Sequence, residues 1–392
     1  MRRIGVVTGS RADYGIYLPL LQDIGSDPAL DLMLFVTGMH LSPEFGSTWE
    51  LIEADGFRIT ERVETIVSSD TPQGIAKSMG LGTIGFAQVF NRERPDLLFV
   101  LGDRLEMHAA AVAALPFKIP LAHIHGGEST EGAFDESLRH SITKLSHLHF
   151  ASAKMYADRL RYMGEEPWRI TMSGALSLDN LRRIALMTRE ELERLVNINL
   201  DKPPFLVTFH PVTLQYEQAQ WQVQQMLEAL KDIGSPIIFT FPNSDTSGRV
   251  IRKEIEVFVS RHPSAVLIDN LGTRAYFSLM MIAAGMIGNS SSGIIEAMSC
   301  SLPVVNIGDR QAGRVKPPNV IDVGYSRDEI VSGIRQAVSP DAREKLKGHV
   351  NPYGDGHAAS VILKKMREVP LDARLLQKRF HSEEHVLSPV EA

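Results

Sequence analysis

Residues 97–152 read LLFVLGDRLEMHAAAVAALPFKIPLAHIHGGESTEGAFDESLRHSITKLSHLHFAS, and this stretch decides the fold class. It holds two apolar runs, at 97–101 and 121–125, joined by an alanine-rich segment of helical character. Short apolar runs that alternate with helical segments are typical of buried parallel strands. We therefore expect an α/β fold built on a parallel sheet.

A short polar group follows each of these two runs: GDR at 102–104 and HGGE at 125–128. In an open parallel sheet, ligands bind outside the carboxyl ends of the strands, so such groups converge there. The side chains that we expect near one crevice are Asp103, Arg104, His123, His125, Glu128, Asp135 and Glu136. This set predicts an active site with several carboxylates and at least one arginine.

The same alternation runs along the rest of the chain. In the first half we expect further strands at 3–8, 32–37, 148–151 and 169–174, and helices from near Tyr14 and at 43–54, 71–94, 135–146 and 153–163. In the second half we expect strands at 205–209, 236–241, 265–268, 285–288, 303–307 and 320–323, and helices at 215–231, 246–261, 274–283, 293–300 and 327–337. The repeated architecture predicts a doubly wound sheet in each half.

The pattern changes to a charged helical segment at 177–204, where Thr188 and Glu191 form a capping box and a double proline ends the helix. We expect α/β domains at 1–175 and 176–352, a helix at 354–367 after the glycine-rich YGDG, and an accessory tail at 368–392.

The composition is that of an ordinary globular protein, with 44% hydrophobic and 22% charged residues. A chain of 392 residues is too long for one comfortable core, which also predicts two domains. The net charge of −6, with lysine and arginine scattered, argues against a nucleic-acid partner. The single cysteine, Cys300, excludes an internal disulfide framework and fits a cytoplasmic location. No apolar run reaches about 18 residues, so we expect no membrane span.

The first strand ends in GSRADYG at 9–15, which carries Arg11. A strand, a small-residue loop with an arginine and a helix start together suit an anion. The loop matches neither GxGxxG nor GxxxxGK[ST], so we infer no dinucleotide and no P-loop triphosphate. A solvated arginine in a βα turn is the alternative.

GNSSSG at 288–293 places Ser290 and Ser291 at another strand-to-helix junction, with Glu296 a turn further on. Serine hydroxyls and helix-start N–H groups suit a phosphate, and Glu296 could hold ribose hydroxyls, although serine is also a favoured N-cap residue. The glycine spacing does not match G-x-S-x-G, so a serine hydrolase is not indicated.

Three further side chains of the second half follow predicted strands: His210 in HPVT, Asn243 and Arg310. Each could face the cleft between the domains, or be a structural histidine or a solvated loop residue. Several histidines occur between 108 and 149, but HEXXH is absent, and we expect no metal site.

These motifs resemble those of the UDP-N-acetylglucosamine 2-epimerase family, in particular its hydrolysing branch, which serves sialic, legionaminic and related acid synthesis. The matching segments run in the family's order to about residue 367: GSRADYG, GDR, GGE with DESLRHSITKLSHLHF, HPVT, GNSSSG with Glu296, GDRQAGR and YGDG. The resemblance implies two Rossmann-like domains of the glycosyltransferase-B type, with a nucleotide sugar in the cleft between them. It also implies that the helix after Tyr353 crosses back to the first domain.

The resemblance further implies roles for individual residues. Diphosphate ligands are expected at Arg11, Arg104, Ser290, Ser291 and Arg310, a ribose clamp at Glu296, and other substrate contacts at Asn243 and His210. The expected catalytic residues are Asp103, Glu128, Asp135 and His210. One departure concerns His125, because relatives of the animal enzyme carry glutamate there. Glu128 is the nearest remaining carboxylate.

The family's reaction eliminates the nucleotide to a glycal and then hydrates it with inversion at C2. The expected substrate is UDP-N-acetylglucosamine, giving N-acetylmannosamine and UDP, with arginines and a protonated His210 on the leaving diphosphate. No cofactor is implied, and the family suggests a homodimer or homotetramer. The alternatives are the same chemistry on UDP- or GDP-N,N'-diacetylbacillosamine, a non-hydrolysing epimerase or glycosyltransferase of the same fold, and a non-catalytic nucleotide-sugar sensor.

Overall fold

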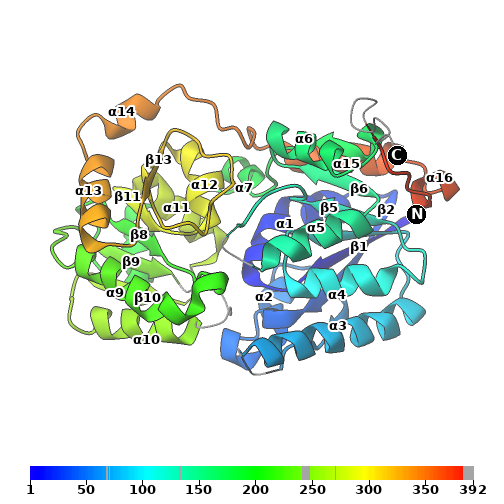
Figure 1. Cartoon of the computed structure of the whole chain (residues 1–392), viewed down its shortest axis with the longest axis horizontal. Helices are drawn as coiled ribbons and strands as arrows, with labels where there is room; N and C mark the ends of the chain where they lie inside the picture. Colours follow the sequence, from blue (N-terminus) through cyan, green and yellow to red (C-terminus); the bar gives the residue numbers. More distant parts are fainter. Residues whose placement is uncertain (68, 70, 132–133, 241–247, 270, 383–392) are drawn as a thin grey trace, which may run out of the picture.

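The computed structural model describes residues 1–67, 69, 71–131, 134–240, 248–269 and 271–382, which form two lobes side by side (Figure 1). Each lobe is a sheet whose hydrogen-bonded neighbours are all parallel, with helices on both faces. This confirms the predicted α/β fold with two Rossmann-like units.

The sheet of the first lobe has seven strands in the order β3-β2-β1-β4-β5-β6-β7. They are β1 (Arg2–Thr8), β2 (Leu30–Thr37), β3 (Ile59–Val63), β4 (Leu97–Leu101), β5 (Leu121–Ile124), β6 (Leu148–Ala151) and β7 (Ile170–Met172). The strand order reverses between β1 and β4, which is where an open α/β sheet binds its ligand. The segments that follow these two strands carry Arg11 and Asp103.

The sheet of the second lobe has six strands in the order β10-β9-β8-β11-β12-β13. They are β8 (Phe205–Thr208), β9 (Ile237–Thr240), β10 (Ala265–Ile268), β11 (Gly285–Gly288), β12 (Val304–Ile307) and β13 (Val320–Val323). Here the order reverses between β8 and β11, whose following segments carry His210 and Ser290.

The helices lie where the alternation of the sequence predicts them, apart from shifts at their ends and the exceptions below. Those up to the start of the second sheet are α1 (Arg11–Gly25), α2 (Trp49–Ala54), α3 (Pro72–Arg92), α4 (Leu105–Ala114), α5 (Asp135–Leu145), α6 (Lys154–Tyr162), α7 (Leu178–Arg183) and α8 (Arg189–Val196). Those after it are α9 (Ala219–Leu230), α10 (Gly248–Val259), α11 (Gly272–Ile282), α12 (Ser291–Ile295), α13 (Arg327–Ala337), α14 (Ala342–Leu346), α15 (Ala358–Glu368) and α16 (Ala373–Leu376). Short 3-10 helices are η1 (Gly38–Leu41), η2 (Pro43–Phe45), η3 (Pro167–Arg169), η4 (Thr213–Gln218) and η5 (Ala297–Cys300).

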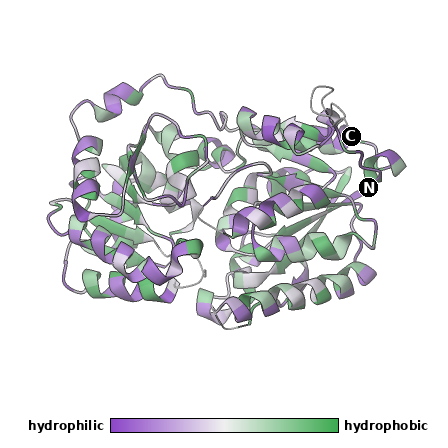
Figure 2. Ribbon diagram, viewed as in Figure 1, coloured by the Kyte–Doolittle hydropathy of each residue, from purple (hydrophilic) through white to green (hydrophobic). Residues whose placement is uncertain are grey.

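The cores lie between the sheets and their helices, where apolar residues concentrate while polar residues cover the outer helix faces (Figure 2). In the first lobe, β1 and β4 are buried from Ile4 and from Leu97 onward. Strands covered on both faces bury apolar side chains in both directions, which explains the continuous apolar runs of the sequence.

Several elements differ from the sequence-based expectation. Helices α14 and α16 were not predicted, the helix expected at 293–300 is divided into α12 and η5, and the one expected at 215–231 begins as η4. Strand β3 was not predicted, because its sequence ITERV is mostly half-exposed at the edge of the sheet and lacks an apolar run. The helix expected at 43–54 is divided into η2 and α2. Left-handed backbone at Gly46 and Ser47, with φ of 85° and 46°, separates the two parts.

The chain returns from the second lobe to the first at its C-terminal end, where α15 packs against α1 (Figure 1). The Asp179 carboxylate, buried in α7, accepts the first two backbone N–H groups of α15, from Ala358 and Ala359, each at 2.8 Å. These orphan donors at a helix start are thereby satisfied. We keep 175/176 as the proposed boundary between the domains.

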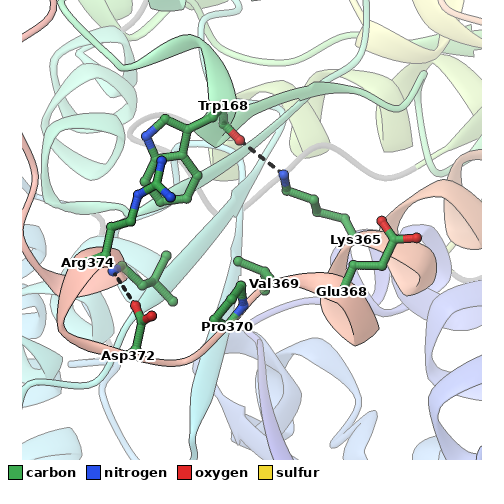
Figure 3. Close-up of a pocket in the computed structure, with 8 residues that line it drawn as sticks. Trp168, Lys365, Glu368, Val369, Pro370, Asp372 and Arg374 are labelled. Atoms are coloured by element: carbon green, nitrogen blue, oxygen red, sulfur yellow. Dashed lines mark hydrogen bonds between the residues drawn. The ribbon is translucent and has the colours of Figure 1, made fainter.

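The segment after α15 docks on the first lobe and encloses the pocket of Figure 3. Buried Arg169 donates to the backbone carbonyls of Leu375 and Gln377, at 2.8 and 3.0 Å. Trp168 and Lys365 line the pocket, with the Lys365 ammonium donating to the Trp168 carbonyl at 3.0 Å. This pocket lies between the C-terminal segment and the first lobe, at the amino end of β7. It is away from the points where the strand order of each sheet reverses. Within the described parts of the chain, no helix is both long and apolar enough to cross a membrane.

Candidate active site

Segments that follow strands of the first sheet contact segments of the second lobe. The Arg11 guanidinium donates to the backbone carbonyl of Asp269, after β10, at 2.5 Å. Arg314, after β12, donates to the carbonyl of Ser129 at 2.8 Å. The facing carboxyl ends of the two sheets thus form one interlobe site.

Two of the motif glycines lie in close approaches, Gly15 between the lobes and Gly288 between neighbouring strands of the second sheet. A Cβ on Gly15 of GSRADYG would lie 2.8 Å from the hydroxyl of Thr273 on α11. Gly288 of GNSSSG has φ of 132°, and a Cβ there would lie 1.9 Å from the Thr208 carbonyl. Only glycine fits at 288, and a larger residue at 15 would have to displace the Thr273 hydroxyl.

Asp103 lies after β4, at the switch point of the first sheet. Its Oδ2 forms an ion pair with the Arg139 guanidinium of α5 and accepts the Thr130 hydroxyl at 3.4 Å. Arg139 is buried, whereas the Asp103 side chain keeps 20% of its exposed area. The ion pair fixes the Asp103 side chain at the switch point and leaves part of it exposed.

Asp135 and Glu136, the first two residues of α5, differ in their surroundings. Glu136 accepts the backbone N–H of Thr130 at 2.6 Å and the hydroxyl of Ser129 at 3.0 Å. Burial opposes its ionisation, but bonds from His140, Thr130 and Ser129 lower its pKa to about 2. Glu136 therefore holds Ser129 and Thr130 against α5, while Asp135 is half-buried as the first residue of that helix.

The predicted arginines surround the interlobe site from both sides. The electrostatic effects of Arg11 and Arg104 both reach the buried His40, and those of Arg104 and Arg310 both reach His210. Since His210 belongs to the second lobe and Arg104 to the first, these cations share one region. Such an array suits a diphosphate.

His210 is neutral in this setting. Burial, followed by the charges of Arg310 and Arg104, lowers its pKa well below the ordinary value. The protonated His210 expected from the sequence is therefore corrected to a neutral imidazole. As a neutral ring it offers a hydrogen bond rather than a charge.

Asn289, which the sequence analysis did not single out, connects three strand ends of the second lobe. Its side chain accepts the His210 N–H at 2.7 Å and donates to the His210 carbonyl at 2.9 Å. Its own carbonyl accepts from Arg310 at 3.3 Å and from Gln311 at 2.8 Å. A fully buried amide between predicted site residues therefore positions both His210 and Arg310.

The serines of GNSSSG at 288–293 serve partly as a helix cap, which was the alternative to phosphate binding. Ser290 is the N-cap of α12 and its hydroxyl accepts the Ser292 N–H at 3.3 Å; Ser291 is the first residue of that helix. Glu296 is buried and accepts the hydroxyl of Ser177, and burial raises its pKa. Asn243 lies outside the described residues.

Two carboxylates missed from the sequence lie beside the first-lobe arginines. Asp13 and Glu106 both come within about van der Waals distance of a Cβ built on Gly9, and Glu106 forms an ion pair with Arg104 at 3.4 Å. Burial first, with Glu106 adding to it and Arg104 opposing it, raises the pKa of Asp13 to about 6. Asp13 belongs to GSRADYG, the motif in which Arg11 alone was predicted as a site residue.

We expect Asp13→Asn to stabilise the protein increasingly as pH rises from about 4 to about 6, with a constant gain above. The folded pKa of about 6 lies above the ordinary 3.8, so the native state holds the extra proton in this window and loses stability as pH rises. The plateau is on the order of 3 kcal/mol before the amide's own contacts are counted. Urea unfolding of both forms at pH 4, 5, 6 and 7.5 measures it, and a pH-independent difference contradicts it.

Across the described part of the chain, no group of three or more His, Cys, Asp or Glu side chains is arranged to hold a metal ion.

The two facing lobes define a protein of the glycosyltransferase-B fold type, as predicted. The family profile described as UDP-N-acetylglucosamine 2-epimerase matches residues 22–367. The chain therefore belongs to the UDP-N-acetylglucosamine 2-epimerase family, which confirms the resemblance of the motifs.

Individual relatives refine this comparison. A Campylobacter jejuni protein named GDP/UDP-N,N'-diacetylbacillosamine 2-epimerase (hydrolyzing) is 40% identical over 323 residues, covering 82% of this chain and 84% of that one. A Legionella pneumophila protein named UDP-N,N'-diacetylbacillosamine 2-epimerase (hydrolyzing) is 38% identical over 378 residues, covering 96% and 99%. The structure of UDP-GlcNAc 2-epimerase from Neisseria meningitidis bound to UDP-GlcNAc has a TM-score of 0.80 at 20% identity, covering 94% and 100%, and supports the fold.

Proposed function

We propose that this protein is a hydrolysing 2-epimerase of nucleotide-linked N,N'-diacetylbacillosamine, releasing the C2 epimer as a free sugar with the nucleoside diphosphate. The two relatives named for that sugar, 40% and 38% identical over most of the chain, carry the proposal. The motifs alone favoured UDP-N-acetylglucosamine, and the relatives support the diacetylbacillosamine alternative better.

The arginines support departure of a nucleoside diphosphate. Arg11, Arg104 and Arg310 come from both lobes and act electrostatically on the same region. Fixed cations stabilise the charge that develops on a leaving diphosphate. Neutral His210 offers a hydrogen bond beside these arginines, and Ser290 and Ser291 lie at the start of α12. We propose Glu296 as the residue that binds the ribose hydroxyls.

The acids support chemistry at C2. The C2 proton of an amino sugar is not acidic, so we propose that its removal accompanies loss of the diphosphate, leaving a C1=C2 double bond. Asp103 and Asp135 are the proposed catalytic carboxylates, and the ion pair with Arg139 holds the Asp103 carboxylate in place. Water then adds at C1, and a proton returns to C2 on the opposite face.

The test is a panel of substrates in deuterated water: UDP- and GDP-N,N'-diacetylbacillosamine and UDP-N-acetylglucosamine. We expect a diacetylbacillosamine form to give free epimer with deuterium at C2, and nucleoside diphosphate in equal amount. Mass spectrometry and NMR of the product measure this. Retention of the nucleotide on the product, a requirement for a sugar acceptor, or binding without turnover would each overturn the proposal, in favour of a non-hydrolysing epimerase, a transferase or a sensor respectively.

UDP-N-acetylglucosamine is the second candidate substrate, because the family bears its name. Faster hydrolysis of this sugar than of both diacetylbacillosamine forms would establish it instead. We also propose a homo-oligomer, which light scattering of the purified protein tests.

A further inference from the structure

His125 has an unusual backbone for a histidine at the end of a buried strand. It follows β5 directly and is left-handed, with φ of 63°. Its N–H donates to the Phe150 carbonyl at 3.1 Å, and its carbonyl accepts from Arg139 at 2.9 Å. Strained residues of this kind persist where the surroundings hold them, and they cluster at functional sites.

The His125 ring is fixed through one of its two nitrogens. Its Nδ1 is hydrogen-bonded to Oε1 of Glu128, which also accepts the Ser152 hydroxyl at 2.5 Å. The other oxygen, Oε2, lies 3.5 Å from the Arg314 guanidinium. Burial opposes ionisation of Glu128, but His125, Arg314 and Arg139 lower its pKa well below the ordinary value. An anionic Glu128 can only accept, so Nδ1 carries the proton.

The second ring nitrogen, Nε2, is buried and has no hydrogen-bond partner among the described residues. Buried polar atoms are almost always paired, and an exception calls for an explanation. The charge of His125 reaches Glu296 on the opposite lobe, so the ring lies close to the second lobe's site residues. A nitrogen prepared in this way suits proton transfer to a bound molecule.

Glu128 itself is less suited to that task. Its oxygens are occupied by His125, Ser152 and Arg314, and a carboxylate so stabilised is a weak base. Asp103 is occupied by the Arg139 guanidinium and the Thr130 hydroxyl, and it is already a proposed catalytic carboxylate of the elimination. The His125 imidazole, with Nδ1 fixed to Glu128 and Nε2 unpaired among the described residues, is the group here placed to donate a proton.

We propose that His125 is the catalytic acid that protonates C2 in the hydration step, with Glu128 as its positioning residue. This inference rests on the proposed function. His125 acts as the imidazolium, with one proton on each ring nitrogen. The Nε2–H bond breaks as the C1=C2 electron pair forms the new C2–H bond, and the ring is left neutral with its remaining proton on Nδ1, beside Glu128. The positive charge at C1 and the ring oxygen then takes up water, whose spare proton goes to solvent.

The titratable and charged groups around His125 come from several elements of both lobes. They are Glu128 and His123 from its own strand and loop, Asp103 after β4, Arg139 of α5, Glu296 after α12 and Arg314 after β12. The pH dependence of the hydration step therefore belongs to this set, with His125 as the member in contact with substrate.

The test uses His125→Asn and His125→Gly in the full chain. Both fit the left-handed backbone, and asparagine can still donate to Glu128, but neither has Nε2. We expect nucleoside diphosphate to be released while the unsaturated sugar accumulates, because hydration falls by about 10²–10⁴-fold. Added imidazole should restore hydration in His125→Gly, and Glu128→Gln should shift the pH profile of hydration. The exposed His349→Asn is the matched control.

Three results would overturn the assignment. In the first, His125→Asn hydrates the unsaturated sugar at the wild-type rate. In the second, a His125 variant no longer releases nucleoside diphosphate but still hydrates unsaturated sugar that is supplied to it. In the third, His125→Gly still binds nucleoside diphosphate but imidazole does not restore its hydration step. The wild-type protein separates this failure from that of the proposed function. If the wild-type protein does not release free epimer, the proposed function fails. If the wild-type protein releases free epimer but the variants give one of these three results, only the role of His125 fails.

Discussion

Replacing Asp103 by asparagine lowers kcat by about 10²–10⁴-fold while binding of the nucleoside diphosphate stays nearly unchanged. The carboxylate lies at the switch point of the first sheet and keeps some exposure toward the interlobe site. An amide has the same shape but cannot take a proton. Initial rates and calorimetric titration with nucleoside diphosphate measure the two quantities separately.

A structural contribution of Asp103 must be separated from its chemistry. In Asp103→Asn, the buried Arg139 keeps its bonds to the His125 carbonyl and the Thr130 hydroxyl but loses its anion. The cost is about 1–3 kcal/mol, so rates are compared well below the thermal midpoint. Asp328→Asn, at a side chain 90% exposed on α13, is the control and retains activity. Normal turnover of folded Asp103→Asn would remove Asp103 from the proposed catalytic residues.

The fold was predictable because its strands are buried on both faces. Apolar runs such as 97–101 mark such strands directly, and the observed β4 has the same limits. Edge strand β3 carries no such mark, since its glutamate and arginine are compatible with solvent. Expected strand ends shifted by one or two residues where a polar residue, such as His125, ends an apolar run.

Ligands of open parallel sheets bind outside the carboxyl ends of the strands, and this rule predicted that Asp103, Arg104, Arg310 and His210 lie in one region. It did not identify Arg139, Asn289 or Arg314, because their roles come from contacts between distant segments. Arg139 sits in the middle of a helix, and its partner Asp103 lies 36 positions away. Asp13 and Glu106 were missed for a related reason. An acid inside a helix pattern looks solvated until packing against a second acid is visible.

Arg314→Met gives the largest loss of stability among the changes considered, about 3–5 kcal/mol. The Arg314 side chain is only 7% exposed, and it crosses from the second lobe to the Glu128 carboxylate and the Ser129 carbonyl of the first. Removing the cation leaves Glu128 as a buried anion with less compensation. Urea unfolding measures the loss, and Arg335→Met, at an exposed arginine of α13, is the matched control.

A double-mutant cycle shows whether the loss belongs to this ion pair. We expect Glu128→Gln and Arg314→Met together to cost less than the sum of the single changes, with a coupling of about 1–3 kcal/mol. The pair also joins the lobes beside His125, so Arg314→Met should raise KM for the nucleotide sugar as well as lower kcat. Additive losses would mean that Arg314 acts through Ser129 and Thr130 alone, in which case the charge that lowers the pKa of Glu128 comes from His125 and Arg139.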